Sequence, residues 1–252
     1  MTRTSPRAAA TAMERRPRLP AGHDERFAGY GVWGLPFTLG DVLAFRRHTA
    51  SSIGPAFTTV CHGDSHGRWT IYTNIAPSRS TPRYFGGALV RVVESEIRLE
   101  WSHDDRVAIC VPEHHLQWAV RLESSGWTRT LSAAARLLPR VTAGSGLPDW
   151  VGATGGRLLQ AGPRPLAGLA PNGHRFAVRP RRLWLATASA AMVEGRELGP
   201  IGPLHGNRRI GDLVLPNRGL FAIHEAHFEP HDPARHLSPA PGALRRGTRR
   251  VS

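Results

Sequence analysis

Residues Ile97–Glu123 read IRLEWSHDDRVAICVPEHHLQWAVRLE, and the alternation within this stretch decides the fold class. Apolar side chains at 97, 99 and 101 alternate with charged ones, and similar alternation recurs over 107–111 and 116–122. A period of two is typical of a β-strand with one buried face. Turn-forming residues separate the three runs at 102–105 and 112–115. The stretch therefore predicts an antiparallel meander with one aliphatic, tryptophan-bearing face and one charged face.

Further strands are predicted on both sides of this meander, interrupted once by a helical segment. Alanine and leucine at helical spacing after Trp127, and a weaker pattern after Asp149, indicate a helical excursion over about 128–161. We predict a mainly β protein, an antiparallel barrel or sandwich with a short helical insertion. The remaining predicted strands are Val42–Arg47, Phe57–His62, Trp69–Ile75, Ala88–Val93, Arg175–Arg179, Arg182–Thr187, Ala191–Val193, Arg196–Leu198, Ile210–Leu215 and Leu220–Phe228.

The organisation predicted for the chain is one folded domain between two basic tails. Residues 1–26 and 229–252 are rich in arginine and proline and lack a strand pattern, so both are expected to be disordered. The domain then spans 27–228. No apolar run approaches the length of a transmembrane helix or of a secretory signal, and two cysteines provide no disulfide framework. These features predict a cytoplasmic protein in which Cys61 and Cys110 are inert.

All 33 basic side chains are arginine, and the sequence contains no lysine. Schiff-base enzymes and P-loop nucleotide sites are thereby excluded, since both need a lysine. The formal net charge of +14 first suggests a nucleic-acid partner. However, residues 27–126 hold nine Arg against nine acidic residues, whereas 127–228 hold 13 against five. Binding to nucleic acid or to an anionic membrane is therefore a hypothesis for the second half and the tails only.

The segment Gly67-Arg68-Trp69-Thr70-Ile71-Tyr72 closes a hairpin that leads onto the long meander. In strand order and aromatic placement, residues 27–126 resemble lipocalin-like barrel proteins, including the carotenoid-hydratase-like branch. This resemblance implies an apolar cavity for a small hydrophobic ligand. It implies no catalytic residue.

Two groups of polar residues are candidates for catalysis. His62, Asp64 and His66 are spaced like metal ligands, but the intervening Gly and Ser residues favour a hairpin turn, so we predict no metal and no cofactor. Glu225 and His227 are expected to share one face of the last strand, with His224 on the other face. If the pair lies inside a barrel, one residue can act as a general base and the other can orient it. If the pair lies on the surface, no catalytic role is expected.

The predicted ligand site combines the connection at 76–86 with tryptophans of the meander. This connection is long for a hairpin and contains Arg79, Arg83 and Tyr84, which suit an anionic head group. Trp101 and Trp118 are predicted to line the apolar part. The leading hypothesis is thus binding of a small apolar or amphiphilic ligand, and the alternative is a hydratase- or isomerase-type enzyme acting on such a molecule.

Overall fold

The computed structural model describes residues 4–137, 166–203, 209–210, 213–214 and 218–237, and it confirms a mainly β protein with short helices. The helices are α1 (Pro6–Arg15), α2 (Pro82–Phe85) and α3 (Gly126–Leu137), with 3₁₀ turns at Pro77–Arg79, Gly86–Ala88 and Pro112–His114. The strands are β1 (Glu25–Val32), β2 (Leu35–Pro36), β3 (Val42–Ser51), β4 (Phe57–Gly63), β5 (Trp69–Thr73), β6 (Leu89–Glu94), β7 (Arg98–His103), β8 (Arg106–Val111), β9 (Leu116–Glu123), β10 (Ala167–Leu169), β11 (Arg175–Val193), β12 (Arg196–Glu197), β13 (Arg209–Ile210), β14 (Leu213–Val214) and β15 (Leu220–Phe228).

Thirteen of these strands form one sheet, whose main path runs β6-β5-β4-β3-β1-β15-β11-β9-β8-β7. The predicted meander is confirmed: Ile109 on β8 lies between Leu99 on β7 and Trp118 on β9, in antiparallel register. The sheet is mixed, however, because β5 and β6 are parallel. The connection between β5 and β6 contains α2 and carries the chain back along the sheet, as a parallel pair requires.

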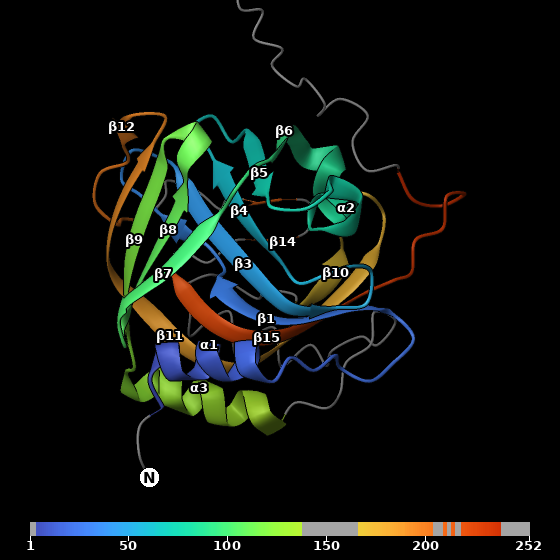
Figure 1. Cartoon of the computed structure of the whole chain (residues 1–252), viewed down its shortest axis with the longest axis horizontal. Coiled ribbons are helices and arrows are strands. Elements are labelled where there is room, and N and C mark those ends of the chain that lie inside the picture. Colours follow the sequence, from blue (N-terminus) through green and yellow to red (C-terminus); the bar gives the residue numbers. More distant parts are fainter. Residues whose placement is uncertain (1–3, 138–165, 204–208, 211–212, 215–217, 238–252) are drawn as a thin grey trace, which may run out of the picture.

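The sheet curls strongly without closing into a barrel (Figure 1). Phe45 on β3 packs edge-on against Trp118 on β9 at 5.8 Å between ring centroids, although three strands separate β3 from β9. The two ends of the path, β6 and β7, are not paired with each other. The observed form is an open, curled sheet.

Each face of the sheet carries a hydrophobic core, and the strands alternate between the two. On β3, Leu43 and Phe45 belong to the core inside the curl, which we call the inner core, together with Trp118 and Phe221. Alternate residues of the same strands, with α2, build the outer core on the opposite face. Its main side chains are Phe27, Val42, Ala44, Phe57, Cys61, Trp69, Ile71, Tyr84, Phe85, Phe176 and Phe228.

Two glycines of β1 let the backbone of β3 approach closely. A Cβ atom on Gly29 or Gly31 would lie 2.0 Å from the carbonyl oxygen of Arg47 or Phe45, respectively. No side chain is compatible with that distance, so the sequence Gly29-Tyr30-Gly31 is a packing requirement. The close approach also places Arg46 of β3 within hydrogen-bond reach of backbone at the end of β1.

The N-terminal stretch differs from the disordered tail predicted for residues 1–26, because residues 6–15 form helix α1. Ser5 caps this helix by accepting a hydrogen bond from the amide of Ala8, and Pro6 occupies the first turn. Ala10 is buried in the inner core. Glu14 accepts hydrogen bonds from the Tyr30 hydroxyl and the Arg47 guanidinium, both at 2.9 Å. The helix therefore packs against the curled sheet (Figure 1).

The helical excursion is present as α3, whereas the segment predicted after Asp149 lies outside the described residues. Residues 229–237, within the predicted C-terminal tail, pack against the 170–174 turn; Leu237 donates its amide hydrogen bond to the Asn172 carbonyl. The three strands predicted between 175 and 193 merge into the single strand β11, which bends at two bulges. Within the described part of the chain, no helix has the length and apolar character needed to cross a membrane.

Candidate functional site

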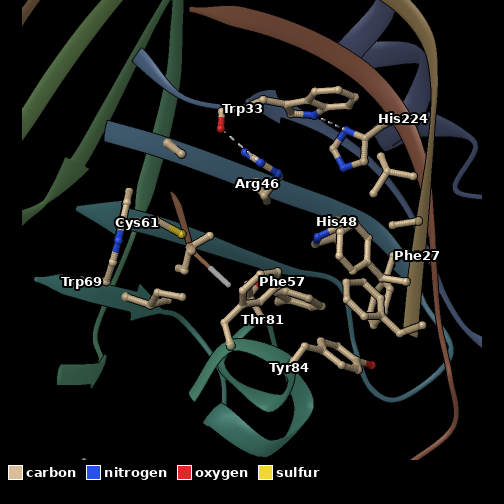
Figure 2. A pocket seen from close by; sticks show the side chains of 18 of the residues that line it. Phe27, Trp33, Arg46, His48, Phe57, Cys61, Trp69, Thr81, Tyr84 and His224 are labelled. Carbon is tan, nitrogen blue, oxygen red and sulfur yellow. Dashed lines mark hydrogen bonds between the residues drawn. The ribbon is translucent and has the colours of Figure 1, made fainter. Parts of the chain in front are cut away.

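A cavity of about 120 Å³ lies in the outer core between the sheet and α2 (Figure 2). Alternate residues of β3, β4, β5 and β15 point into it, because the strand period places every second side chain on this face. Most of the lining is aromatic or aliphatic. Its members with a side-chain polar or sulfur atom are Trp33, Arg46, His48, Cys61, Trp69, Thr81, Tyr84 and His224.

Arg46 is a cation set in this apolar surrounding. Its guanidinium donates hydrogen bonds to the carbonyl oxygens of Val32 at 2.6 Å, Phe45 at 3.1 Å and Trp33 at 3.4 Å. None of the described carboxylates forms an ion pair with it. Burial lowers the pKa of Arg46 to about 10, so the side chain remains charged at neutral pH. The cavity therefore contains a positive charge that backbone dipoles only partly balance.

Two histidines flank the same cavity. The ring centroids of His48 and His224 are 5.6 Å apart, and the indole nitrogen of Trp33 donates to Nδ1 of His224 at 3.4 Å. The same Nδ1 also lies 3.4 Å from the Ala222 carbonyl oxygen, so it accepts from Trp33 in one tautomer and donates to Ala222 in the other. Burial, with the nearby Arg46 charge, lowers the pKa of His224 to about 3 and that of His48 well below its usual value. Both rings are therefore neutral at pH 7.

Nδ1 of His48 is buried and has no hydrogen-bond partner. A buried imidazole nitrogen without a partner is uncommon in a folded protein, because its desolvation is not compensated. Cys61, across the cavity, is a free thiol whose pKa burial raises to about 11. It is therefore protonated and not a nucleophile, which agrees with the inert packing expected from the sequence.

The residues predicted to bind the ligand are only partly brought together. Tyr84 lines the cavity and stacks on Phe228 with ring centroids 3.9 Å apart. Both Arg83 and the Tyr84 hydroxyl donate to the carboxylate of Glu25. Arg79 is exposed. Ligand binding by Arg79 or Arg83 stays a prediction, and the cavity itself offers Arg46 instead.

Trp101 and Trp118, the predicted apolar part of the site, belong to the inner core on the other face of the sheet. Trp101 packs edge-on against Phe221, and the indole of Trp118 donates to Ser189 at 2.9 Å. Neither side chain lines the outer-core cavity. Their distance from Tyr84 follows from the sheet, which separates the two cores.

The two groups of catalytic candidates lie apart, because His62, Asp64 and His66 line one surface hollow to which neither Glu225 nor His227 contributes. His62 contacts the Asp41 carboxylate at 2.8 Å, while Asp64 is engaged by Arg68 and by backbone amides of its own turn. Glu225 pairs with Arg179 and Arg181, and His227 lies 3.5 Å from Asp24. Catalysis by these residues therefore stays a prediction.

Sequence reasoning missed Arg46, His48 and His224 as cavity residues. The signal was present in β3, where Val42, Ala44, Arg46 and His48 occupy alternate positions and so share one face. On β15, His224 was correctly placed on the opposite face from Glu225 and His227. What could not be read from the sequence was that the His224 face is covered by α2 and buried.

Comparison with known proteins gives no assignment. No family model and no curated protein matches the sequence. Among solved structures, an acetoacetate decarboxylase from Legionella pneumophila is 10% identical, with a TM-score of 0.39 over 88% of this chain and 92% of that one. An AttH protein from Nitrosomonas europaea is 12% identical, with a TM-score of 0.28 over 84% of this chain and 55% of that one. Both TM-scores are too low to support any conclusion about activity, and the lipocalin-like resemblance stays a hypothesis.

Proposed function

We propose that the protein binds a small apolar carboxylic acid in the outer-core cavity, with the carboxylate at Arg46 and the hydrocarbon part against the aromatic wall. The observation that supports this most directly is the charged guanidinium that faces an apolar cavity without a protein carboxylate. A guanidinium pairs well with a planar carboxylate because two of its N–H groups can donate in parallel.

The size of the cavity limits the ligand. An apolar protein cavity of about 150 Å³ holds a molecule of the size of benzene, and this one has about 120 Å³. The ligand therefore has few carbon atoms, of the order of those in butyrate. Longer amphiphiles, which the sequence hypothesis also allowed, fit only if the cavity enlarges.

An enzymatic role for the same cavity is the second candidate. It is suggested by the two neutral imidazoles of His48 and His224 in the cavity wall, whose lowered pKa values make them weak bases. Because the chain has no lysine, we do not propose a decarboxylase that forms a lysine Schiff base with its substrate. Mass spectrometry of the acid recovered after incubation in D₂O separates the two roles, since only an enzyme exchanges a carbon-bound hydrogen or changes the mass by reaction.

The binding test uses butyrate and its uncharged match, butyramide, in isothermal titration with the purified chain. We expect butyrate to bind more tightly than butyramide. A hydrogen bond to a charged group contributes about 1.5–3 kcal/mol, so Arg46→Gln should weaken butyrate binding by roughly 10- to 150-fold and leave butyramide nearly unchanged.

Arg47→Gln is the matched control, because Arg47 is the next residue but pairs with Glu14 on the other face of the sheet. Native mass spectrometry, followed by release under denaturing conditions, identifies any acid that co-purifies. The proposal fails if the wild-type chain binds no short carboxylate, or if the two arginine variants lose butyrate affinity equally.

A further inference from the structure

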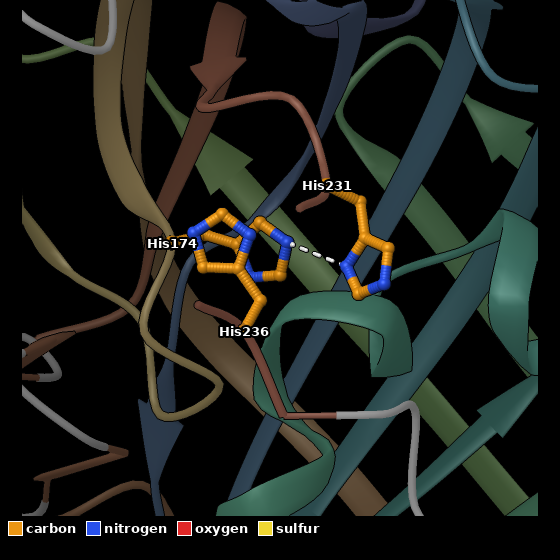
Figure 3. A group of neighbouring side chains, drawn as sticks. All are labelled: His174, His231 and His236. Carbon is orange, nitrogen blue, oxygen red and sulfur yellow. Dashed lines mark hydrogen bonds between the residues drawn. The ribbon is translucent and has the colours of Figure 1, made fainter. Parts of the chain in front are cut away.

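A group of three histidines, none of which lines the cavity, lies where the C-terminal segment meets the turn before β11 (Figure 3), and the His174 ring is 5.1 Å from the ring of the cavity residue Tyr84 between centroids. His174 ends that turn, and His231 and His236 follow β15. One ring nitrogen from each residue lies within 4.8 Å of those from the other two. His174 and His236 are buried, whereas His231 is partly exposed. The cluster joins residues far apart in the sequence, so motif spacing could not reveal it.

The spacing of two of the nitrogens fits a tetrahedral metal ion. Nε2 of His174 and Nδ1 of His231 are 3.3 Å apart. Zinc binds imidazole nitrogen at 2.0–2.1 Å, so tetrahedral angles place two such ligands about 3.3–3.4 Å apart. The third ring, His236, is stacked on His174 with 22° between the planes, so it must rotate as well as approach to direct a nitrogen lone pair at the same centre.

A carboxylate lies close to His236. Metal-bound histidines usually donate the N–H of their second ring nitrogen to such a group. Nε2 of His236 is 3.5 Å from the Glu229 carboxylate, while Nδ1 of the same ring accepts the backbone amide of Asp232 at 2.9 Å. A metal at Nδ1 would replace this amide contact and leave Nε2–H directed at Glu229.

The rings are also in the protonation state that metal binding needs. His174 and His236 stack with centroids 3.8 Å apart, and two positive rings at this separation would repel each other. Neutral imidazole is the form that coordinates late transition metals such as zinc.

We propose that His174, His231 and His236 form a binding site for one divalent late transition metal ion, most simply Zn²⁺, with Glu229 orienting His236. The ion would clamp the segment after β15 to the turn before β11. That turn contacts α2 through Asn172, whose amide group bonds Arg83 O and the Gly87 amide. The site is thus linked to the cover of the cavity, although the proposal does not depend on the ligand assigned there.

The test is titration of the EDTA-treated, dialysed full chain with ZnCl₂, read by calorimetry and by thermal unfolding. We expect one Zn²⁺ per chain and a rise in the melting temperature. His231→Ala should weaken Zn²⁺ binding at least tenfold and abolish this rise. His231 is partly exposed, so the variant is expected to fold, and circular dichroism checks this.

Two further variants make the result specific. His103→Ala removes an exposed histidine outside the cluster and should leave Zn²⁺ binding unchanged. His231→Cys replaces one zinc ligand by another and should restore binding and the rise in melting temperature. The proposal is overturned if the wild-type chain binds no Zn²⁺ stoichiometrically, or if His231→Ala and His103→Ala have the same effect.

Discussion

His224 and His48 show what burial does to a single titratable side chain. Both rings lie beside the cavity near the charged Arg46, and both are held neutral by desolvation. In the unfolded chain each would bind a proton near pH 6.5. Their contribution to stability is therefore fully present above the unfolded pKa, and it is lost progressively as the pH falls below that value.

For His224 we expect a loss of unfolding free energy whose slope rises from about 0.7 kcal/mol per pH unit at pH 6.5 to about 1.4 kcal/mol per pH unit near pH 5. The carboxyls of Glu14, Glu25 and Asp41 have pKa values lowered by their hydrogen bonds, against the opposing effect of burial, so they affect stability only at lower pH. Urea unfolding at a series of pH values measures the slope. His224→Gln should lower this slope by the equivalent of about one bound proton, whereas His103→Gln should leave it unchanged. Equal slopes in the wild type and in both variants would contradict the burial of His224.

Residue patterns predicted where side chains point better than they predicted what surrounds them. Alternation correctly placed His224 opposite Glu225, and it placed Trp118 on an apolar face. It did not reveal that Arg83 is paired with Glu25, because these residues come from segments far apart in the sequence. Long-range pairing of this kind depends on the packing of α2 over β1, which no local pattern specifies.

At the scale of elements, α3 replaces a strand at the point where β9 ends. Leu185 of β11 is the last position paired with β9, and beyond it the same edge of β11 is covered by α3. The buried hydroxyl of Ser132 accepts the amide of Leu183 at 2.9 Å and donates to Thr128 O at 2.6 Å. One side chain thus satisfies a strand amide that has lost its partner strand.

Ser132→Ala should therefore destabilise the protein by about 1–3 kcal/mol, the cost of leaving a buried amide without a partner. Chemical denaturation measures this change. Thr130→Ala, on the exposed side of the same helix, is the control and should change stability by less than about 0.5 kcal/mol. If Ser132→Ala destabilises the protein no more than Thr130→Ala does, the Leu183 amide does not need a hydrogen bond to α3.

The elements that the sequence predicted well are those with strict alternation. Leu220–Phe228 was predicted with its observed bounds, and the meander of β7, β8 and β9 was correct in order and direction. Strand β1 was missed, because Gly29 and Gly31 weaken its pattern. Those glycines serve the close approach of β3, so the feature that hid the strand is one that its packing requires.

For the whole molecule, the arrangement of the two β halves is now defined. Strands β15 and β11 of the second half lie between β1 and β9 of the first, so the halves share one sheet. Among the described arginines of the second half, Arg179 and Arg181 share the Glu225 carboxylate, and Arg182 lies 5.9 Å from the Trp184 ring. Binding to nucleic acid or to anionic membranes stays a prediction.

One sheet with a core on each face should unfold as a single cooperative unit, because β3, β4, β5 and β15 contribute to both cores. Ile109→Val in the inner core and Ile71→Val in the outer core should each cost about 0.5–1.5 kcal/mol and lower the same transition. Thermal unfolding is followed by far-UV circular dichroism and by tryptophan fluorescence. Coincident curves are expected for the wild type and for both variants. Two transitions, each sensitive to only one substitution, would show instead that the faces of the sheet are independent folding units.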